Sequence, residues 1–161
     1  MKKQSGFTLI ELLLVLAIIG IISAIAIPAL LSQRARARDK AAVQNTDSCV
    51  ADMVGQWDKF RELGSTPANC VLQVTSYMKA VHANDKNPWN TAVAAYAPIT
   101  SVAGNKTASE FNGAMALGNM GSTMVYMQVP SSTTGGFCGG AVLLNNKVNG
   151  STAYKKSTAI E

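Results

Sequence analysis

The chain has 161 residues, of which 48% are hydrophobic and only 14% charged, and its formal net charge is +5. Two of the lysines, Lys2 and Lys3, lie at the N-terminus, and the balance of +3 without them is poor evidence for nucleic-acid binding. The single histidine and three scattered cysteines, without a C-x-x-C pair, argue against a metal site. No paired acid and base and no phosphate-binding loop is present, so the sequence predicts neither an enzyme nor a cofactor.

The first predicted element is an apolar stretch from Phe7 to Leu31, with 25 residues and one ionisable side chain, Glu11. A helix crosses a bilayer core of about 30 Å with about 20 apolar residues, so this stretch is long enough to span a membrane. A carboxylate inside such a stretch costs roughly 2.5–3.5 kcal/mol on insertion scales. Glu11 is therefore predicted to be functional and to need a cationic partner.

Two residues inside this helix are expected to loosen or kink it. Gly20 is a poor helix former, and Pro28 removes one backbone hydrogen bond.

A short basic leader, Met1–Gly6, precedes the apolar stretch, and the string from Gly6 to Glu11 reads GFTLIE. This arrangement resembles the class III signal of type IV prepilins and pseudopilins, and the resemblance covers about the first 40 residues. It implies that a prepilin peptidase cuts between Gly6 and Phe7 and that the new Phe7 amine is N-methylated. It also implies that Glu11 faces the Phe7 amine of a neighbouring subunit in a filament.

Three other interpretations of this end of the chain remain open. Glu11 could contact the Phe7 amine of its own chain, one helical turn away. The N-terminus could be an ordinary secretory signal cut near Ala24-Ile25-Ala26, in which Glu11 would have no purpose. The stretch could also be a plain single-span anchor.

The helix is predicted to continue beyond the apolar stretch to about Leu63. From Ser32 the sequence is polar and free of proline, and Gly64 supplies a C-terminal stop. Apolar positions recur at spacings of three and four, which marks one helix face. These positions are Val43, Thr46 or Cys49, Val50, Met53, Trp57 and Phe60.

The remainder of the chain predicts a small α+β domain. A second helix is expected over about 67–82, with Thr66 as its N-cap, followed by a turn over 84–90. The predicted strands are Thr123–Val129, Phe137–Leu144 and Thr152–Ile160, with hairpin residues at 145–150. The segments 91–99 and 110–117 are ambiguous. The long helix would lie on an antiparallel meander of three or four strands, which is also the pilin head that the resemblance implies.

These elements suggest three parts: a leader over 1–6, a membrane or filament-core helix over 7–31, and a globular head over 32–161. In an oxidising compartment we expect one disulfide, Cys70–Cys138, with Cys49 left on the apolar helix face. If 66–80 were not helical, Cys49–Cys70 would be the better pairing. His82 is expected to be a surface residue near a turn.

The resemblance implies a structural subunit of a type IV pilus, which waits in the inner membrane and is then polymerised by the assembly machinery into an extracellular homopolymer. Adhesion, motility and DNA uptake are the functions such filaments serve. One alternative is a major pseudopilin of a type II secretion system, although few carboxylates follow Glu62 to bind calcium. Another is a minor or competence-type pilin that binds DNA or a surface. Its candidate patch is Lys147, Tyr154, Lys155 and Lys156.

Overall fold

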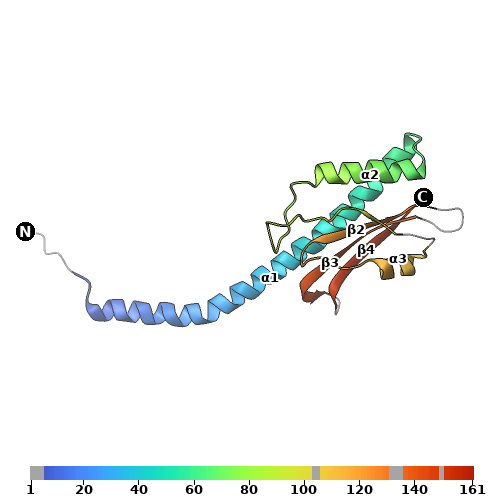
Figure 1. Cartoon of the computed structure of the whole chain (residues 1–161). Coiled ribbons are helices and arrows are strands. Elements are labelled where there is room, and N and C mark those ends of the chain that lie inside the picture. The colour runs from blue at the N-terminus through green and yellow to red at the C-terminus, as the bar shows by residue number, and fades with distance from the viewer. Residues whose placement is uncertain (1–5, 103–105, 131–135, 149–150) are drawn as a thin grey trace, which may run out of the picture. The chain divides into compact units, whose positions relative to one another are not determined.

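The computed structural model describes residues 6–102, 106–130, 136–148 and 151–161 (Figure 1). The chain divides into two compact units, Met1–Ala35 and Arg36–Glu161. The described residues form seven elements in chain order: α1 (Leu9–Glu62), α2 (Pro67–Val81), β1 (Thr100–Ser101), α3 (Ala108–Ala114), β2 (Thr123–Gln128), β3 (Gly136–Val148) and β4 (Ser151–Ile160).

The first unit holds the apolar part of α1, and nearly all of its described side chains are exposed. The helix runs through Gly20 and Pro28 without interruption, so the kinks expected there stay predictions. By length and composition, α1 is the one helix in the described residues that could cross a membrane. The predicted membrane-length helix is therefore confirmed.

In the second unit, α1 buries one stripe of side chains along its length. The stripe consists of Asp39, Ala42, Thr46, Cys49, Val50, Met53 and Trp57. The predicted face is thus confirmed from Thr46 to Trp57, because positions three and four residues apart lie on one side of a helix.

A glycine ends α1 by the predicted mechanism. Gly64 has a φ of 82°, a left-handed conformation that residues with a Cβ rarely adopt. The N–H of Ser65 donates to the carbonyl of Phe60 over 3.0 Å, and that of Gly64 donates to Arg61 over 2.9 Å. This is the hydrogen-bond pattern of a Schellman motif, which satisfies the last carbonyls of the helix and turns the chain sharply.

The second helix also begins as the sequence predicts. The side chain of Thr66 accepts a hydrogen bond from the backbone N–H of Asn69, and Pro67 occupies the first turn. The helix buries Cys70, Val74 and Met78. Spacings of four residues place these three side chains on one face, so α2 packs by a single apolar stripe.

The four strands form one sheet in the order β1-β2-β3-β4. The pairs β2–β3 and β3–β4 are antiparallel, as predicted, whereas the two-residue β1 lies parallel to β2. The hairpin expected over 145–150 was partly wrong. β3 continues to Val148, which pairs with Ser151 after a register shift that begins at Leu143.

Two segments that the sequence left ambiguous take different structures. Residues 91–99 contain turns and isolated bridges, among them Tyr96 with Thr123. Residues 108–114 form α3, whose N-terminus is a capping box between Thr107 and Glu110. Two hydrogen bonds from Thr107 lower the pKa of the Glu110 carboxyl.

Helices cover both faces of the sheet. On one face, α1 and α2 contribute to the main core; its buried members are Cys49, Met53, Trp57, Cys70, Val74, Met78, Val125, Met127, Cys138 and Ile160. On the other face, Phe111 and Met115 pack with Tyr126 and Ala141.

Two consecutive glycines in β3 allow side chains of the helices to lie close to the sheet on both of its faces. A Cβ on Gly139 would lie 2.7 Å from the Phe111 ring, and one on Gly140 would lie 2.9 Å from Thr46 Cγ2. Side chains of successive strand residues point to opposite faces, so each glycine makes room on its own side.

Candidate assembly site

α1 begins with a capping box formed by Thr8 and Glu11. The backbone N–H and the Oγ1 of Thr8 both donate to Glu11 Oε2 over 2.9 Å, and the N–H of Glu11 donates to Thr8 Oγ1 over 3.4 Å. These bonds satisfy donors that a helix N-terminus leaves without a partner. Glu11 could be singled out from the sequence, whereas Thr8 was missed, although a threonine three residues before a glutamate is the known signal for this motif.

The predicted cleavage residues lie just outside the helix. Gly6 and Phe7 are exposed and precede the first helical residue, Leu9, and the Phe7 side chain is 86% exposed. The Gly6–Phe7 peptide bond is therefore open to an enzyme in the isolated chain.

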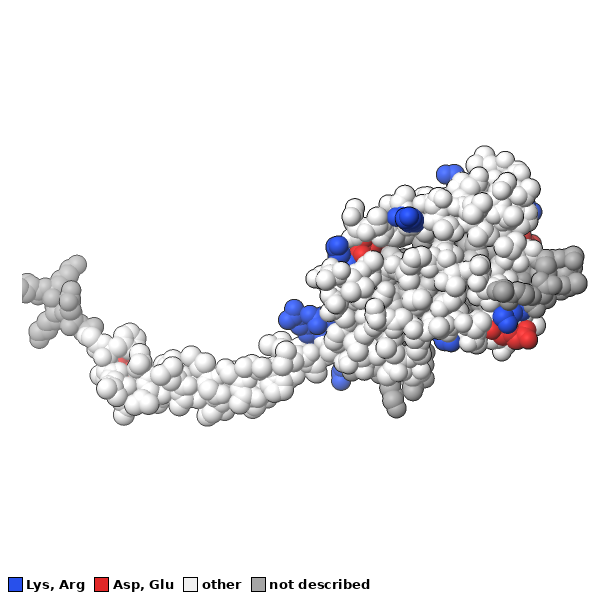
Figure 2. Space-filling model, in the orientation of Figure 1, with Lys and Arg blue, Asp and Glu red and all other residues white. Residues whose placement is uncertain are grey.

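The apolar part of α1 presents a long surface without protein contacts in the first unit. Its leucine, isoleucine and valine side chains from Leu9 to Leu31 are largely exposed. Figure 2 shows this part of the helix as uncharged except for one small acidic spot near its beginning. An apolar surface of this extent is stable only when lipid or other protein covers it.

All three cysteines are buried and carry free thiols. Burial raises the pKa of the Cys49 thiol to about 12, and the Asp52 and Asp85 carboxylates contribute less to this rise. Burial, followed by Cys49 and Asp58, raises the pKa of the Cys138 thiol to about 12. Thiolates are the species that oxidise, so these raised pKa values lower the reactivity of Cys49 and Cys138 while both stay buried.

The three cysteines come from different elements, namely α1, α2 and β3, but they belong to one core cluster. The Cys70–Cys138 pairing stays a prediction. The alternative pairing, Cys49–Cys70, depended on 66–80 not being helical, whereas α2 is helical from Pro67 to Val81.

The expectation for His82 was wrong in one respect. The residue does lie at a turn, as the C-cap of α2, but its side chain is only 12% exposed. Its Nδ1 is 2.6 Å from Asp85 Oδ2, its Nε2 is 3.2 Å from Asp52 Oδ2, and its ring centroid is 4.7 Å from that of Tyr96. The side chain is covered because the end of α2 packs between α1 and the segment that follows it.

The candidate DNA-binding patch is partly engaged within the head. The Tyr154 hydroxyl donates to Asp47 Oδ1 over 2.8 Å, and Lys155 Nζ donates to the carbonyl of Asn112 over 2.9 Å. Lys156 is exposed, and the side chain of Lys147 lies outside the described residues. Across the residues that the structure describes, no three His, Cys, Asp or Glu side chains are grouped so that they could hold a metal ion.

Comparisons with known proteins point to one kind of protein. A family model described as "Prokaryotic N-terminal methylation motif" matches residues 1–27. The type IV major fimbrial protein FimA of Dichelobacter nodosus is 30% identical over 137 residues, which cover 81% of this chain and 86% of the relative. The type IV wide pilus major component PilA4 of Thermus thermophilus is 36% identical over 96 residues, covering 47% of this chain and 67% of the relative.

A third relative has a higher identity over a shorter stretch. A fimbrial protein of Pseudomonas aeruginosa is 52% identical over 48 residues, which are 30% of this chain and 31% of the relative. No solved structure was found to match the chain.

Proposed function

Because this chain belongs to the type IV pilin family, we propose that it is a major structural subunit of a type IV pilus and polymerises through the helix at Phe7–Leu31. The observation that carries this function is the exposed apolar surface of α1, most of which lies within the residues that the methylation-motif model matches. The precursor resides in the membrane and the mature subunit in an extracellular pilus. The pseudopilin and DNA-binding alternatives are not favoured by these relatives.

We further propose the processing steps that this motif implies. A prepilin peptidase removes residues 1–6 by cutting the exposed Gly6–Phe7 bond, and the Phe7 amine is then methylated. The mature chain would consist of a filament-core helix over 7–31 and a head over 32–161.

In the filament, the Glu11 carboxylate would face the Phe7 amine of a neighbouring subunit. Both hydrogen bonds that Glu11 accepts from Thr8 use one carboxylate oxygen, Oε2. Oε1 is therefore the atom to which the foreign ammonium would bind. A charge in an apolar bundle is costly alone and tolerated when paired, so the pair would fix the register between subunits.

Three substitutions separate the charge of Glu11 from its role as a helix cap. Glu11→Ala removes both, Glu11→Gln keeps an acceptor for Thr8 but removes the charge, and Thr8→Val keeps the charge but weakens the cap. We expect both Glu11 variants to insert and be cleaved normally but to give few surface filaments. Thr8→Val should still assemble. Sheared filaments are quantified by gel and electron microscopy.

Glu110→Gln is the matched control, because Glu110 caps α3 through Thr107 with the same bonds that Glu11 makes with Thr8. It should assemble like the wild type. Normal filaments from Glu11→Gln would show that the charge is not needed and would contradict the role proposed for it.

A further inference from the structure

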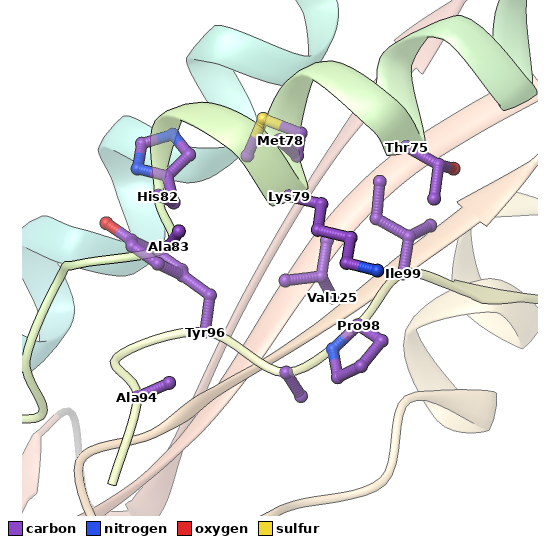
Figure 3. A pocket seen from close by; sticks show the side chains of 11 residues that line it. Thr75, Met78, Lys79, His82, Ala83, Ala94, Tyr96, Pro98, Ile99 and Val125 are labelled. Carbon is purple, nitrogen blue, oxygen red and sulfur yellow. The ribbon is translucent and has the colours of Figure 1, made fainter. Parts of the chain in front are cut away.

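The head contains a cavity of about 360 Å³ that no part of the proposed function uses. It lies among the last turns of α2, the segment 94–99 and β2, as Figure 3 shows. Its walls are mostly apolar, and Met78, Tyr96, Pro98, Ile99 and Val125 supply much of this lining. A cavity of this size with apolar walls is a typical binding site for an apolar group.

One cation at this cavity is available to a partner. In Figure 3 the Lys79 side chain extends from α2 towards Ile99, and both residues line the cavity. Within the described chain, no carboxylate lies within salt-bridge distance of this amine. His82, by contrast, already faces a carboxylate with each ring nitrogen. The cavity therefore favours an apolar group with a carboxylate beside it.

The corner between α1 and α2 carries this combination of groups. Leu63 is 72% exposed, which makes it the most exposed large hydrophobic side chain described in the second unit. The exposed Glu62 precedes it directly, and the Schellman motif at Gly64 holds the corner in one conformation. The cation nearest in sequence, Arg61, donates to the carbonyl of Ser65 over 2.9 Å.

Other exposed apolar side chains fit the cavity less well. Leu72 is 67% exposed, but α2 contains no acidic residue to accompany it. Leu117, Met120 and Val129 have no adjacent acidic residue in the sequence either.

The corner and the cavity lie at opposite ends of α2, a helix of 15 residues and therefore about 22 Å long. Leu63 cannot reach the cavity of its own subunit across a rigid helix. It can reach the cavity of another copy. A contact between two different patches of the same protein repeats without closing when the rotation allows it, and it then builds an open helical polymer.

We propose that Leu63 of one subunit enters the Met78–Val125 cavity of a neighbouring subunit, with Glu62 paired to the neighbour's Lys79. This contact rests on the proposed function, because it requires a filament, and it assigns the heads a share in holding that filament together. It would add a second registration point to the one proposed at Phe7 and Glu11.

Cysteine cross-linking within assembled filaments tests the contact. The double variant Leu63→Cys, Ala83→Cys places one new thiol at the corner and one at the cavity lining. Under mild oxidation its sheared filaments should give a ladder of covalent multimers on a non-reducing gel. Each single variant should stay monomeric, which also controls for the three buried native cysteines. Filaments of the double variant that remain monomeric on the gel would overturn the proposal.

Exchanging the charges of Glu62 and Lys79 tests the proposed contact even if the double cysteine variant does not assemble. Glu62→Lys and Lys79→Glu should each lower the filament yield, by about twofold to fivefold for an exposed pair, and the combined variant should recover it. Asp58→Lys, an exposed charge one turn earlier on α1, should show no recovery with Lys79→Glu. A combined variant no better than the single ones would sink the contact, whereas absence of filaments from the wild type would instead contradict the proposed function.

Discussion

Asp39 shows how the head keeps a charge in its interior. Its side chain is 3% exposed, and its Oδ1 accepts hydrogen bonds from Trp89 Nε1 over 3.1 Å and from the N–H of Asn145 over 3.0 Å. The Arg38 guanidinium lies 5.3 Å from the centre of the Trp89 ring. A buried carboxylate is tolerated when donors surround it, so Asp39 ties α1 to the turn at Trp89 and to β3.

Tyr154, which is partly covered and hydrogen-bonded to Asp47 of α1, makes the stability of the fold depend on pH in the alkaline range. Burial, and then the hydrogen bond to Asp47, raises the pKa of the Tyr154 phenol to about 12. The folded pKa lies above the unfolded value of about 10, so this contact stabilises the fold fully below about pH 10. Its contribution is lost as the pH rises towards 12.

We predict that Asp47→Ala lowers the pKa of Tyr154 towards 10, although not fully, because burial remains. The measurement is tyrosinate absorbance against pH, with Tyr154→Phe used to isolate the signal of this residue. Asp58→Ala, which removes an exposed carboxylate elsewhere on α1, is the control. A Tyr154 titration that does not respond to Asp47→Ala would mean that the hydrogen bond contributes nothing.

At the residue scale, the sequence predicted what depends on neighbours along the chain. Trp57 as a core residue and Glu11 as an isolated carboxylate both follow from local patterns. Asp85 is a local partner of His82, but the second partner, Asp52, and the partner of Tyr154, Asp47, could not be predicted, because Asp52 lies 30 residues before His82 and Asp47 lies 107 residues before Tyr154. Such contacts are set by how the elements pack, which periodicity does not contain.

At the scale of elements, the consecutive glycines of β3 set how closely the helices approach the sheet. We predict that Gly140→Ala destabilises the head by about 1–3 kcal/mol, the usual cost of overpacking. The Cβ of the new alanine would lie 2.9 Å from Thr46 Cγ2 and 3.0 Å from Thr123 Cγ2. The hydroxyl groups of Thr46 and Thr123 are themselves hydrogen-bonded over 2.8 Å. The measurement is the free energy of unfolding in denaturant, followed by tryptophan fluorescence.

Gly55→Ala is the matched control for this variant. Gly55 lies in α1 and has open space where an added methyl group would lie, so alanine should stabilise the helix by about 0.5–1 kcal/mol. If Gly140→Ala proved as stable as the wild type, the strand would have room to shift and the tight packing described for β3 would be refuted.

The ends of α1, α2, β2 and β4 were predicted to within two residues, whereas the short elements were not predicted. β1 has only two residues, and its parallel pairing with Tyr126 and Met127 on β2 determines it. α3 buries only one side chain, Phe111, so its sequence shows no helical repeat of apolar residues. The three-residue spacing of Thr107 and Glu110, which is typical of a capping box, could have predicted where it begins. The extension of β3 was missed because asparagines favour turns, whereas Asn145 here donates to buried Asp39.

At the scale of the whole molecule, processing can be read from the mass of the mature chain. We predict that subunits from sheared filaments have lost residues 1–6 and gained one methyl group at Phe7. Alkylation after denaturation should label one thiol if Cys70 and Cys138 have paired and three after reduction. Intact-mass spectrometry with N-terminal fragmentation measures all of these.

The control is the same chain made in cells without a prepilin peptidase, which should keep its full mass and remain in the membrane. Filament subunits that still begin with Met1–Gly6 would contradict the cleavage, and three labelled thiols without reduction would contradict the disulfide. The α+β class and the membrane-length helix were predictable, since both follow from patterning, whereas the way the three cysteines share one core was not.

The exposed apolar surface of α1 has a consequence for how subunits move between the membrane and the filament. A subunit that left its lipid or its polymer for the surrounding liquid would expose the whole row of aliphatic side chains from Leu9 to Leu31 at once. Subunits must therefore pass directly between the bilayer and the filament. The number of subunits held in the membrane would then limit the length of each filament. A filament that has lost its tip could not be extended there by subunits from the surrounding solution.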